Sequence, residues 1–524
     1  MPAHLDKTLA YASASLIQLP PGPRGLPLVG NLLSLRDPDK IPEITTEWMR
    51  KYGSIVYTRM GGTNFIWLNS PKAVKDLMDK RGSIYSSRPR MPMVKIPAFE
   101  AVSNKKRQFF MPYSEEWRAL RKVSHAALNL KTSQSYIPVQ DFESKQVIWE
   151  LLHAKDDWEF YDHNRRYANS VIMLITYGHR VATWTDPWFK KIFSVLEHFT
   201  LMAEPGAWLV DGFPSLSKLP SVLVQNWWKV GREWHAQDSA VFLELYRDLV
   251  AKIEKGIAPD CFVKDFYLAH PEKNGIDEEG AAYAAGSMVE AGSESTSTVI
   301  NSWLLSCLLW PDVVKKGQEE IDRVVGSGRM PEFSDESSLP YVRAMAKEAL
   351  RWRPITKLGT PHATTEDDWY EGYFIPKGSV VVLNWWAIHY DNNRWRQPEI
   401  YDPSRYLNDP LSTAEAMTTA EPEDRDHFTY GAGRRACPGV HIAQNSLFIN
   451  MARVLWAFNI TKAVDQEGKV IEPSTKTEQG FLGIPERFPC HFEARSPDRA
   501  RIVEEAWRTA EKEGLHWTRT KRNM

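Results

Sequence analysis

The longest helical pattern in this chain runs over residues 277–310 and stops at Pro311, so a large share of the fold is expected to be helix. Helical patterns also dominate the first half of the chain, including one that follows a capping Ser114. Another helical pattern ends before Pro354. Strand-like runs come later: the Pro-Lys-Gly turn in GYFIPKGSVVVLNWWAIH predicts a hairpin, and strands are expected again around residues 460–495. The pattern predicts a mainly α protein with a small β portion.

Length and composition place the chain among large folded proteins. It has 524 residues, of which 43% are hydrophobic and 25% are charged, with a net charge of −1. The balanced charge gives no reason to expect a nucleic-acid partner. No stretch reaches the roughly 18 consecutive apolar residues of a membrane span. We expect an N-terminal segment over 1–18 without a clear membrane anchor, one domain over 19–496, and a charged tail over 497–524 that forms a solvated helix.

The four cysteines are too few and too dispersed for a disulfide scaffold, but Cys437 lies in an unusual segment, YGAGRRACPG. Its glycines let the backbone approach a flat ligand closely. A helix that begins after Pro438 would aim amide N–H groups at the sulfur, lower the thiol pKa and favour thiolate. Arg434 and Arg435 add positive charge suited to the carboxylates of a cofactor. Such a thiolate is a natural axial ligand for haem iron; the alternative is a buried structural cysteine in a glycine turn.

This segment resembles the haem-ligand loop of the cytochromes P-450, in which Phe-x-x-Gly-x-Arg-x-Cys-x-Gly is characteristic, with Tyr430 at the Phe position. Four positions match in register: Gly433, Arg435, Cys437 and Gly439. The resemblance runs from about Pro20 to about Ser496, and KEALRWRP and EGYFIPKG are most similar to fungal secondary-metabolite members of the O-methylsterigmatocystin oxidoreductase-like group. It implies a single-domain cytochrome P-450 fold, with haem b between the long distal helix and the loop that carries Cys437 as the iron ligand.

Glu348 and Arg351 are three residues apart, so they can pair on one face of their helix. Taken alone, this is an ordinary ion pair. The resemblance implies a third partner, Arg405, in the segment Pro-Ser-Arg-Tyr, where Ser404 replaces the usual Glu of the family. The three residues would then form a structural triad behind the haem.

Six of the eight residues in the segment 291–298 are Gly, Ser or Thr, all mediocre to poor helix formers. Hydroxyl side chains can bond back to the preceding turn and loosen the helix, which would open a groove for a small ligand. The alternative is a Ser/Thr-rich helix packed tightly against a neighbour. The resemblance favours the groove and implies that Glu294, with Ser295 or Thr296, relays protons to bound dioxygen.

Three further residues join Arg435 as candidates to bind the haem propionates. Trp117 and Arg121 are four residues apart and share a helix face, like the Trp-x-x-x-Arg pair of the family. Spacing alone fits a partly buried Trp beside a solvated Arg equally well. His362, in Thr-Pro-His-Ala, lies where the family often places another propionate donor.

The resemblance implies a haem-thiolate monooxygenase that uses dioxygen and electrons from NADPH. A separate flavoprotein reductase would deliver these electrons, because the chain shows no Rossmann glycine fingerprint. The cavity walls are expected in four largely apolar stretches: 91–113, Met288–Ser295, Ile355–Leu358 and Phe481–Ile484. The substrate is therefore expected to be a small hydrophobic molecule that the enzyme hydroxylates or otherwise oxidises, in secondary-metabolite biosynthesis.

Two other functions stay open at this stage. The enzyme could couple phenolic or indolic radicals without inserting oxygen, or the chain could bind haem without turnover. The segment 291–298 speaks against a passive binder, which has little need for a proton relay. The protein is expected to be intracellular, and the resemblance implies the cytoplasmic face of the endoplasmic reticulum.

Overall fold

The computed structural model describes residues 18–37, 40–89, 106–204, 206–478 and 480–517. Its longer helices are α2 (Ile41–Tyr52), α5 (Glu115–Leu128), α7 (Ile137–Leu152), α8 (Phe160–Tyr177), α9 (Pro187–Met202), α11 (Trp227–Glu254), α13 (Glu278–Leu309), α14 (Pro311–Val324), α15 (Pro340–Trp352), α18 (Val440–Ala457) and α19 (Pro497–Glu513). The shorter ones are α3 (Pro71–Val74), α4 (Gly82–Tyr85), α6 (Leu130–Gln134), α10 (Leu209–Gly212), α12 (Phe262–Leu268), α16 (Trp385–His389) and α17 (Thr413–Ala416).

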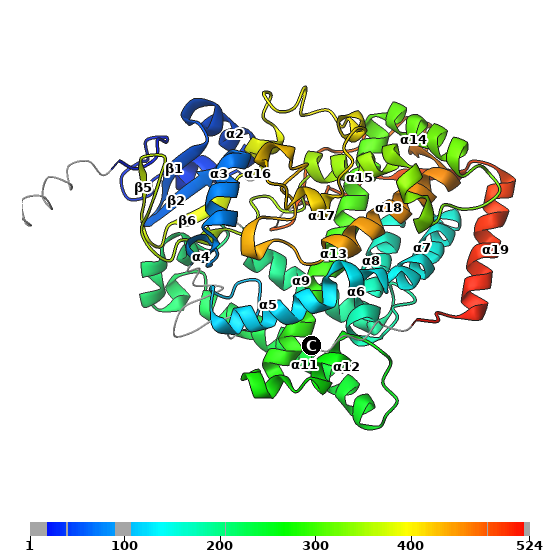
Figure 1. Cartoon of the computed structure of the whole chain (residues 1–524), viewed down its shortest axis with the longest axis horizontal. Coiled ribbons are helices and arrows are strands. Elements are labelled where there is room, and N and C mark those ends of the chain that lie inside the picture. The colour runs from blue at the N-terminus through cyan, green and yellow to red at the C-terminus, as the bar shows by residue number, and fades with distance from the viewer. Residues whose placement is uncertain (1–17, 38–39, 90–105, 205, 479, 518–524) are drawn as a thin grey trace, which may run out of the picture.

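The strands of the described residues form small sheets near the edge of the helical body (Figure 1). The largest has the order β1 (Ile55–Met60), β2 (Thr63–Leu68), β6 (Val380–Leu383) and β3 (His362–Ala363). Two pairs complete the set: β4 (Asp368–Tyr370) with β5 (Tyr373–Ile375), and β7 (Phe458–Lys462) with β8 (Cys490–Ala494). The prediction of a mainly α protein with a small β portion is confirmed.

The hairpin expected around the Pro-Lys-Gly turn is wrong. β5 pairs instead with β4, through a turn in which Glu371 (φ 50°) and Gly372 (φ 83°) both adopt the left-handed conformation that a two-residue hairpin requires. β6 runs parallel to β2 and antiparallel to β3, and all four of its residues are buried. The turn over 376–378 therefore connects two different sheets. The segment Trp385–His389, expected within the strand-rich stretch, forms α16.

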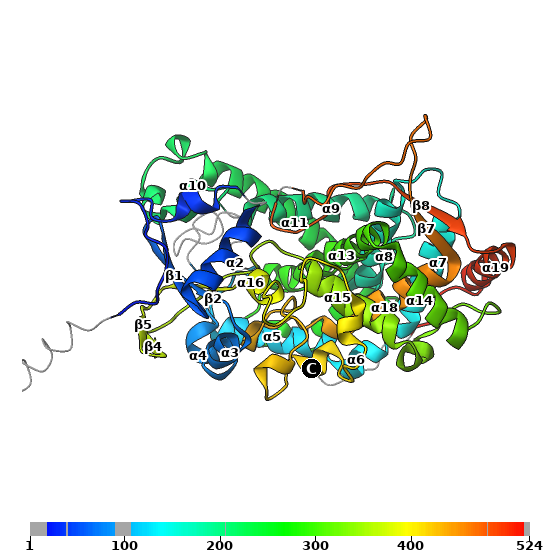
Figure 2. The same cartoon turned by 90° about the horizontal axis from the view of Figure 1, so that it is seen from above.

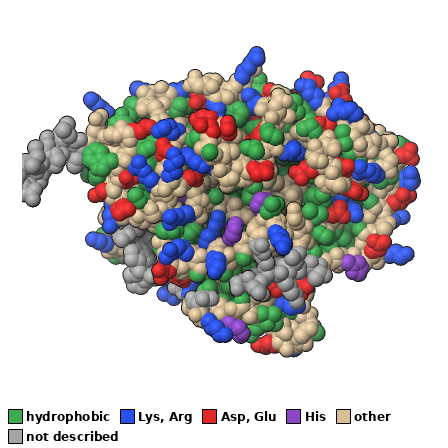
Figure 3. Space-filling model, viewed as in Figure 1, with side chains coloured by type: hydrophobic (Ala, Val, Ile, Leu, Met, Phe, Trp, Pro, Cys, Tyr) green, Lys and Arg blue, Asp and Glu red, His purple; other side chains and the backbone are tan. Residues whose placement is uncertain are grey.

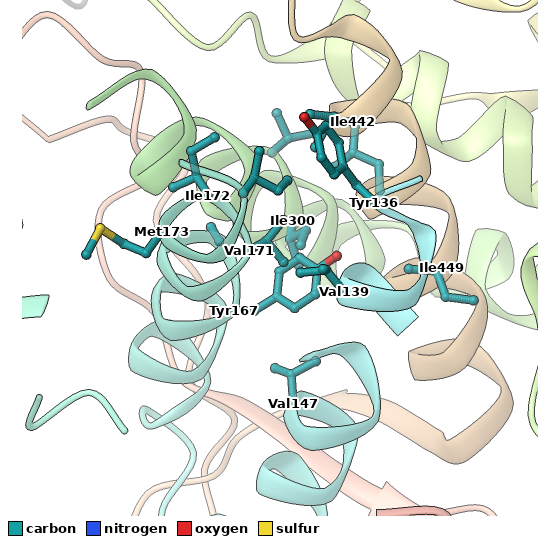
Figure 4. Close-up of a cluster of buried hydrophobic side chains, with 14 of the residues drawn as sticks. Tyr136, Val139, Val147, Tyr167, Val171, Ile172, Met173, Ile300, Ile442 and Ile449 are labelled. Atoms are coloured by element: carbon teal, nitrogen blue, oxygen red, sulfur yellow. The ribbon is translucent and has the colours of Figure 1, made fainter. Parts of the chain in front are cut away.

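The helix expected over 277–310 is confirmed as α13, the central helix of the body (Figures 1 and 2). Asp277 caps its N-terminus by accepting a hydrogen bond from the Gly280 amide. α13 packs most extensively against α8. The Ile172 side chain of α8 packs directly on Gly292 of α13, where a Cβ atom would lie 2.7 Å from Cγ1 of Ile172. Figure 4 shows the core between α7, α8, α13 and α18, including Val139, Tyr167, Ile300 and Ile449.

Most other predicted helix and strand limits agree with the structure. Ser114 caps α5 by accepting from the Trp117 amide, α15 ends before Pro354, and β7 and β8 lie within the expected strand region. The tail helix differs: α19 is not solvated all round but packs on α7, with Val503 and Trp507 buried. Apolar side chains at this helical spacing require a partner surface. Residues 1–17 and 518–524 lie outside the described residues. Among the helices that are described, none is long and apolar enough to cross a membrane.

Candidate functional site

A cavity of about 380 Å³ lies between α13 and the Cys437 loop. Its lining is mostly apolar, and it includes Met288, Ile355, Leu358 and Phe481 from three of the four stretches predicted as walls. From the fourth stretch, 91–113, only Gln108 and Phe109 line it within the described residues, and 91–105 lies outside them. The remaining walls come largely from α5, α8, α9, α18 and the Cys437 loop. The position and lining fit the binding of a small apolar molecule next to a cofactor.

The Cys437 loop is held in place by backbone contacts. The Cys437 amide donates to the Tyr430 carbonyl at 2.8 Å, and the Gly433 amide donates to Oδ1 of Asp79 at 2.6 Å. Gly433 has φ 62°, and a Cβ atom there would lie 2.2 Å from the carbonyl oxygen of Met78. Only glycine fits this position. The loop ends at the N-terminus of α18, and the Cys437 side chain faces the cavity.

The thiol pKa of Cys437 differs from the expectation. Burial raises it, while the Gly439 amide and Arg121 lower it only in part. The Gly439 amide before α18 does lower the thiol pKa in the predicted direction, but loss of solvent around the sulfur raises it by more, so the net shift is upward. A metal ion deprotonates a coordinating thiol outright, so the loop still fits a thiolate ligand.

Three guanidinium groups line the cavity without an acidic partner among the described residues: Arg88, Arg121 and Arg435. Arg88 donates to the carbonyls of Phe109, Thr360 and Pro361; Arg435 donates to those of Ser86 and Met111; Arg121 donates to that of Ala436. Burial lowers the pKa of Arg88 to about 9 and that of Arg435 to about 8, and it also lowers the pKa of Arg121.

Such a group of buried cations is costly unless an anion balances it. A ligand with two carboxylates next to Cys437 would supply that balance, and haem carries two propionates. The residues present therefore fit the haem that the resemblance implies. Arg88 is a site residue that sequence reasoning missed. Its only sequence signal is its place in the segment Ser-Arg-Pro-Arg, before a stretch without clear periodicity. The fold, and not the local sequence, places Arg88 close to Arg435.

Trp117 and Arg121 both line the cavity, and the Arg435 guanidinium lies 4.1 Å from the Trp117 ring. His362 also lines it, but its Nδ1 lies 2.7 Å from the Tyr85 carbonyl and must donate to that oxygen. Burial and the neighbouring Arg88 lower the pKa of His362 well below its usual value. The ring is then neutral, with its one proton on Nδ1, so Nε2 has no proton to give to a carboxylate. The donor role predicted for His362 requires a second proton, on Nε2, and stays a prediction, because a carboxylate beside the ring and Arg88 would favour the protonated form.

On the distal side, the segment 291–298 remains continuous α-helix, and the predicted local opening is not seen. The hydroxyls do bond back to the preceding turn: Ser295 donates to the Ala291 carbonyl at 2.7 Å. Ser295 and Thr296 both line the cavity. Glu294 is buried, and Arg165 of α8 donates to its Oε1 at 2.9 Å. Burial raises the pKa of Glu294 against the opposing effect of Arg165, so the carboxyl holds a proton more readily than usual.

The predicted triad is assembled in the structure. Glu348 accepts two hydrogen bonds of 2.7 Å from Arg351 and one of 3.3 Å from Arg405. Thr429, at the start of the Cys437 loop, donates to the Leu350 carbonyl of α15 at 2.7 Å, so the triad helix supports that loop. Tyr430 is buried, and its hydroxyl has no hydrogen-bond partner among the described residues.

Comparisons with known proteins agree with this geometry. A family model described as cytochrome P450 matches residues 20–489. The chain is 56% identical to cytochrome P450 monooxygenase verL of Clonostachys rogersoniana, over 95% of this chain and 91% of the relative. It is 37% identical to cytochrome P450 monooxygenase virE of Hypocrea virens, over 93% and 87%. It is 38% identical to cytochrome P450 monooxygenase fogE of Aspergillus ruber, over 93% and 89%.

Proposed function

The chain belongs to the cytochrome P450 family and is a haem-thiolate monooxygenase, and we propose that it hydroxylates or otherwise oxidises a small hydrophobic molecule in secondary-metabolite biosynthesis. The observation that carries this proposal is the largely apolar cavity bordered by both the Cys437 thiol and the Ser295 hydroxyl. The names of the relatives favour oxygen insertion over oxidative coupling and over non-catalytic haem binding.

We assign the residues as follows. Cys437 would ligate the haem iron, and Arg121 and Arg435, together with Arg88, would hold the propionates beside Trp117. Gly433 and Tyr430 shape the loop, and the triad of Glu348, Arg351 and Arg405 supports it. When bound, haem supplies dioxygen binding and activation. The protein's own part is to position the substrate, exclude water and deliver protons.

Proton delivery is assigned to Glu294 with Ser295 or Thr296. Burial raises the pKa of Glu294, which makes its carboxyl a better proton carrier than an exposed glutamate, and the bond from Arg165 occupies only Oε1. The Ser295 hydroxyl, one turn after the exposed Ala291, lies on the cavity face of α13. Its hydrogen bond to the Ala291 carbonyl orients it, which substitutes in part for the methyl group of a threonine.

We propose NADPH and a separate flavoprotein reductase as the electron source. The surface beside the Cys437 loop is basic: Lys122 and Lys131 are exposed next to His441, which follows Cys437 in the first turn of α18. α5, which carries Lys122, crosses the face seen in Figure 1, and Figure 3 shows Lys, Arg and His side chains there. An acidic patch on a reductase would complement this surface.

The test of the function is turnover with a purified reductase, NADPH and ¹⁸O-labelled dioxygen over a panel of aromatic polyketides, terpenoids and indole alkaloids. We expect substrate-dependent NADPH oxidation and one labelled oxygen atom in the product. A coupled product without label would contradict oxygen insertion. NADPH oxidation that no panel member stimulates would contradict the proposed substrate class.

We propose a location at the cytoplasmic face of the endoplasmic reticulum. Leu28, Val222 and Leu223 are largely exposed, on two stretches that meet where Leu32 packs beside Gly212. Flotation with phosphatidylcholine vesicles tests this: the protein should float with them, and it should remain at the bottom if the proposal is wrong. The division into 1–18, a haem domain over 19–496 and a tail over 497–524 is also a proposal. The packing of α19 on α7 favours counting 497–513 with the haem domain.

A further inference from the structure

Glu290, one residue before the Ser/Thr-rich segment of α13, is a buried carboxylate in the wall of the cavity. Only 8% of the residue is exposed. We propose that Glu290 anchors the substrate by accepting a hydrogen bond from an N–H or O–H group of an otherwise apolar, aromatic molecule. This inference rests on the proposed function, because it concerns the same cavity.

The neighbours of Glu290 leave its carboxylate incompletely satisfied. Nη2 of Arg107 forms an ion pair with Oε1 of Glu290 at 3.0 Å, and the same nitrogen donates a hydrogen bond to Asp238 at 2.6 Å. The second Asp238 oxygen accepts from His198 at 2.7 Å. Asp238 is thus fully paired, whereas Oε1 of Glu290 accepts no hydrogen bond from the described residues. Oε1 itself is closed off from the cavity, so the donor of a ligand would approach the other carboxylate oxygen, Oε2, of a side chain that is 7% exposed. A poorly satisfied buried carboxylate gains from such a donor.

The charges of Arg107, Asp238 and Glu290 also favour a ligand-binding role for Glu290. Arg107 carries one positive charge, and its two acidic neighbours, Asp238 and Glu290, carry two negative charges when both are ionised. Burial and the charge of Asp238 raise the pKa of Glu290 to about 7, in spite of Arg107. A structural ion pair has no need for this second carboxylate, and perturbed acids in a cavity wall are typical of functional sites.

The side chains around Glu290 indicate that the body of the ligand is aromatic. The Arg107 guanidinium, which pairs with Glu290, also lies 5.9 Å from the Phe199 ring. Glu290 and the Phe199 ring are therefore both neighbours of Arg107. Phe199 packs edge-on against Phe109 and Phe481, and all three rings line the cavity. Edge-to-face contacts of this kind extend naturally to an aromatic ligand. The wall therefore combines aromatic surface with one hydrogen-bond acceptor.

The test uses haem-loaded enzyme and two matched ligand pairs: 3-phenylindole with 1-methyl-3-phenylindole, and 4-phenylphenol with 4-methoxybiphenyl. Methylation removes the donor and leaves the aromatic body. Dissociation constants are measured by calorimetry for wild type, Glu290→Leu and Glu290→Gln. Glu278→Gln is the control, since Glu278 lies on the same helix but is exposed and paired with Arg247.

In wild type and in the Glu278→Gln control, the N–H or O–H member of at least one pair should bind at least tenfold more tightly than its methylated partner. The ratio should fall to about one in Glu290→Leu and to an intermediate value in Glu290→Gln, whose amide oxygen still accepts. Arg107 keeps Asp238 in both variants, so both are expected to fold.

Ratios near one for both pairs in wild type would overturn the proposal, and so would a tenfold ratio that persists in Glu290→Leu. If Glu290→Leu does not fold, an affinity ratio in Glu290→Gln that equals the wild-type ratio would also overturn the proposal. Failure of the proposed function is a separate outcome. It would appear as a reduced carbon-monoxide spectrum without a thiolate signature, which these ligand affinities do not determine.

Discussion

At the scale of single residues, the site holds three cations that no acidic side chain of the described residues balances. Within the described part of the chain, Arg88, Arg121 and Arg435 bond only to backbone carbonyls, and they line the cavity next to Cys437. A buried cation retains much of its electrostatic energy for an incoming anion, because little water screens it. We therefore expect the haem-free chain to carry a stability penalty that haem binding removes.

Arg435→Gln should reduce the stabilisation that hemin gives to the protein. The gain in free energy of unfolding on hemin addition should shrink by about 2–5 kcal/mol, because a propionate loses a buried cation. Thermal unfolding with and without hemin measures this. The neighbouring Arg434→Gln is the matched control, since Arg434 is exposed. Equal gains in both variants would contradict the assignment of Arg435.

Glu290 should make stability depend on pH. Because burial raises its pKa from 4.5 to about 7, the folded state holds a proton between these values that the unfolded state releases. Stability therefore falls as pH rises through this window. Arg107, Asp238, Tyr283 and, through Asp238, His198 face this carboxyl.

Glu290→Gln removes this titration. Relative to wild type, the variant should gain stability as pH rises from 4.5 to 7, by on the order of 3 kcal/mol, and then level off. Glu278→Gln should show no such gain, because Arg247 lowers the pKa of Glu278. Denaturant melts at several pH values provide the comparison. A constant difference between Glu290→Gln and wild type would show that Glu290 titrates as an ordinary carboxyl.

At the scale of elements, the Cys437 loop depends on one close backbone approach. Gly431 (φ 71°) and Gly433 (φ 62°) both adopt a left-handed conformation. They differ in their surroundings: a Cβ atom on Gly433 would meet the Met78 carbonyl oxygen at 2.2 Å, whereas on Gly431 the nearest atom would be 3.9 Å away. The loop must therefore rest directly on the segment that carries Met78.

Gly433→Ala should abolish haem retention, because the loop has to move away from Met78 and takes Cys437 with it. Gly431→Ala should cost only about 1 kcal/mol of backbone strain and keep the haem. Haem content per protein after purification, together with circular dichroism to confirm folding, separates the two variants. Equal haem content in folded Gly433→Ala would refute the role of this contact.

Local signals allowed some elements to be predicted and not others. Ser114, Asp277 and Pro354 limit helices through caps and a missing amide, which act within one turn, so the predicted ends hold. The partner of β6 could not be predicted, since Val380–Leu383 pairs with Thr63–Leu68, far away in the sequence. The site residues divide in the same way. Cys437 could be predicted from a local sequence motif, whereas Arg88 and Glu290 could be identified as site residues only from their neighbours in the folded structure.

At the scale of the whole molecule, α19 completes the surface of α7. Trp507 packs against Phe142 and Trp149, and Arg180 lies over the Trp507 ring. Sequence periodicity showed a helix here, but charge at its exposed positions suggested a solvated one. The apolar residues at i and i+4, Val503 and Trp507, are the signal that favours packing.

Trp507→Ala should lower the free energy of unfolding by about 3–5 kcal/mol, the usual cost of truncating a large buried aromatic side chain. The exposed Arg508→Ala, one position away, should change it by less than about 0.5 kcal/mol. Haem content should be the same in both, because α19 does not line the cavity within the described residues. A stable Trp507→Ala variant would mean that α19 is a detachable tail.

The central claim is that the Cys437 sulfur ligates haem iron, and a reduced carbon-monoxide difference spectrum tests it most directly. Wild type should show the shifted Soret band of a thiolate-ligated haem. Cys437→Ala should lose that band, while Cys490→Ala, which removes a buried cysteine outside the cavity, should keep it. A thiolate-type spectrum in folded Cys437→Ala would contradict the account.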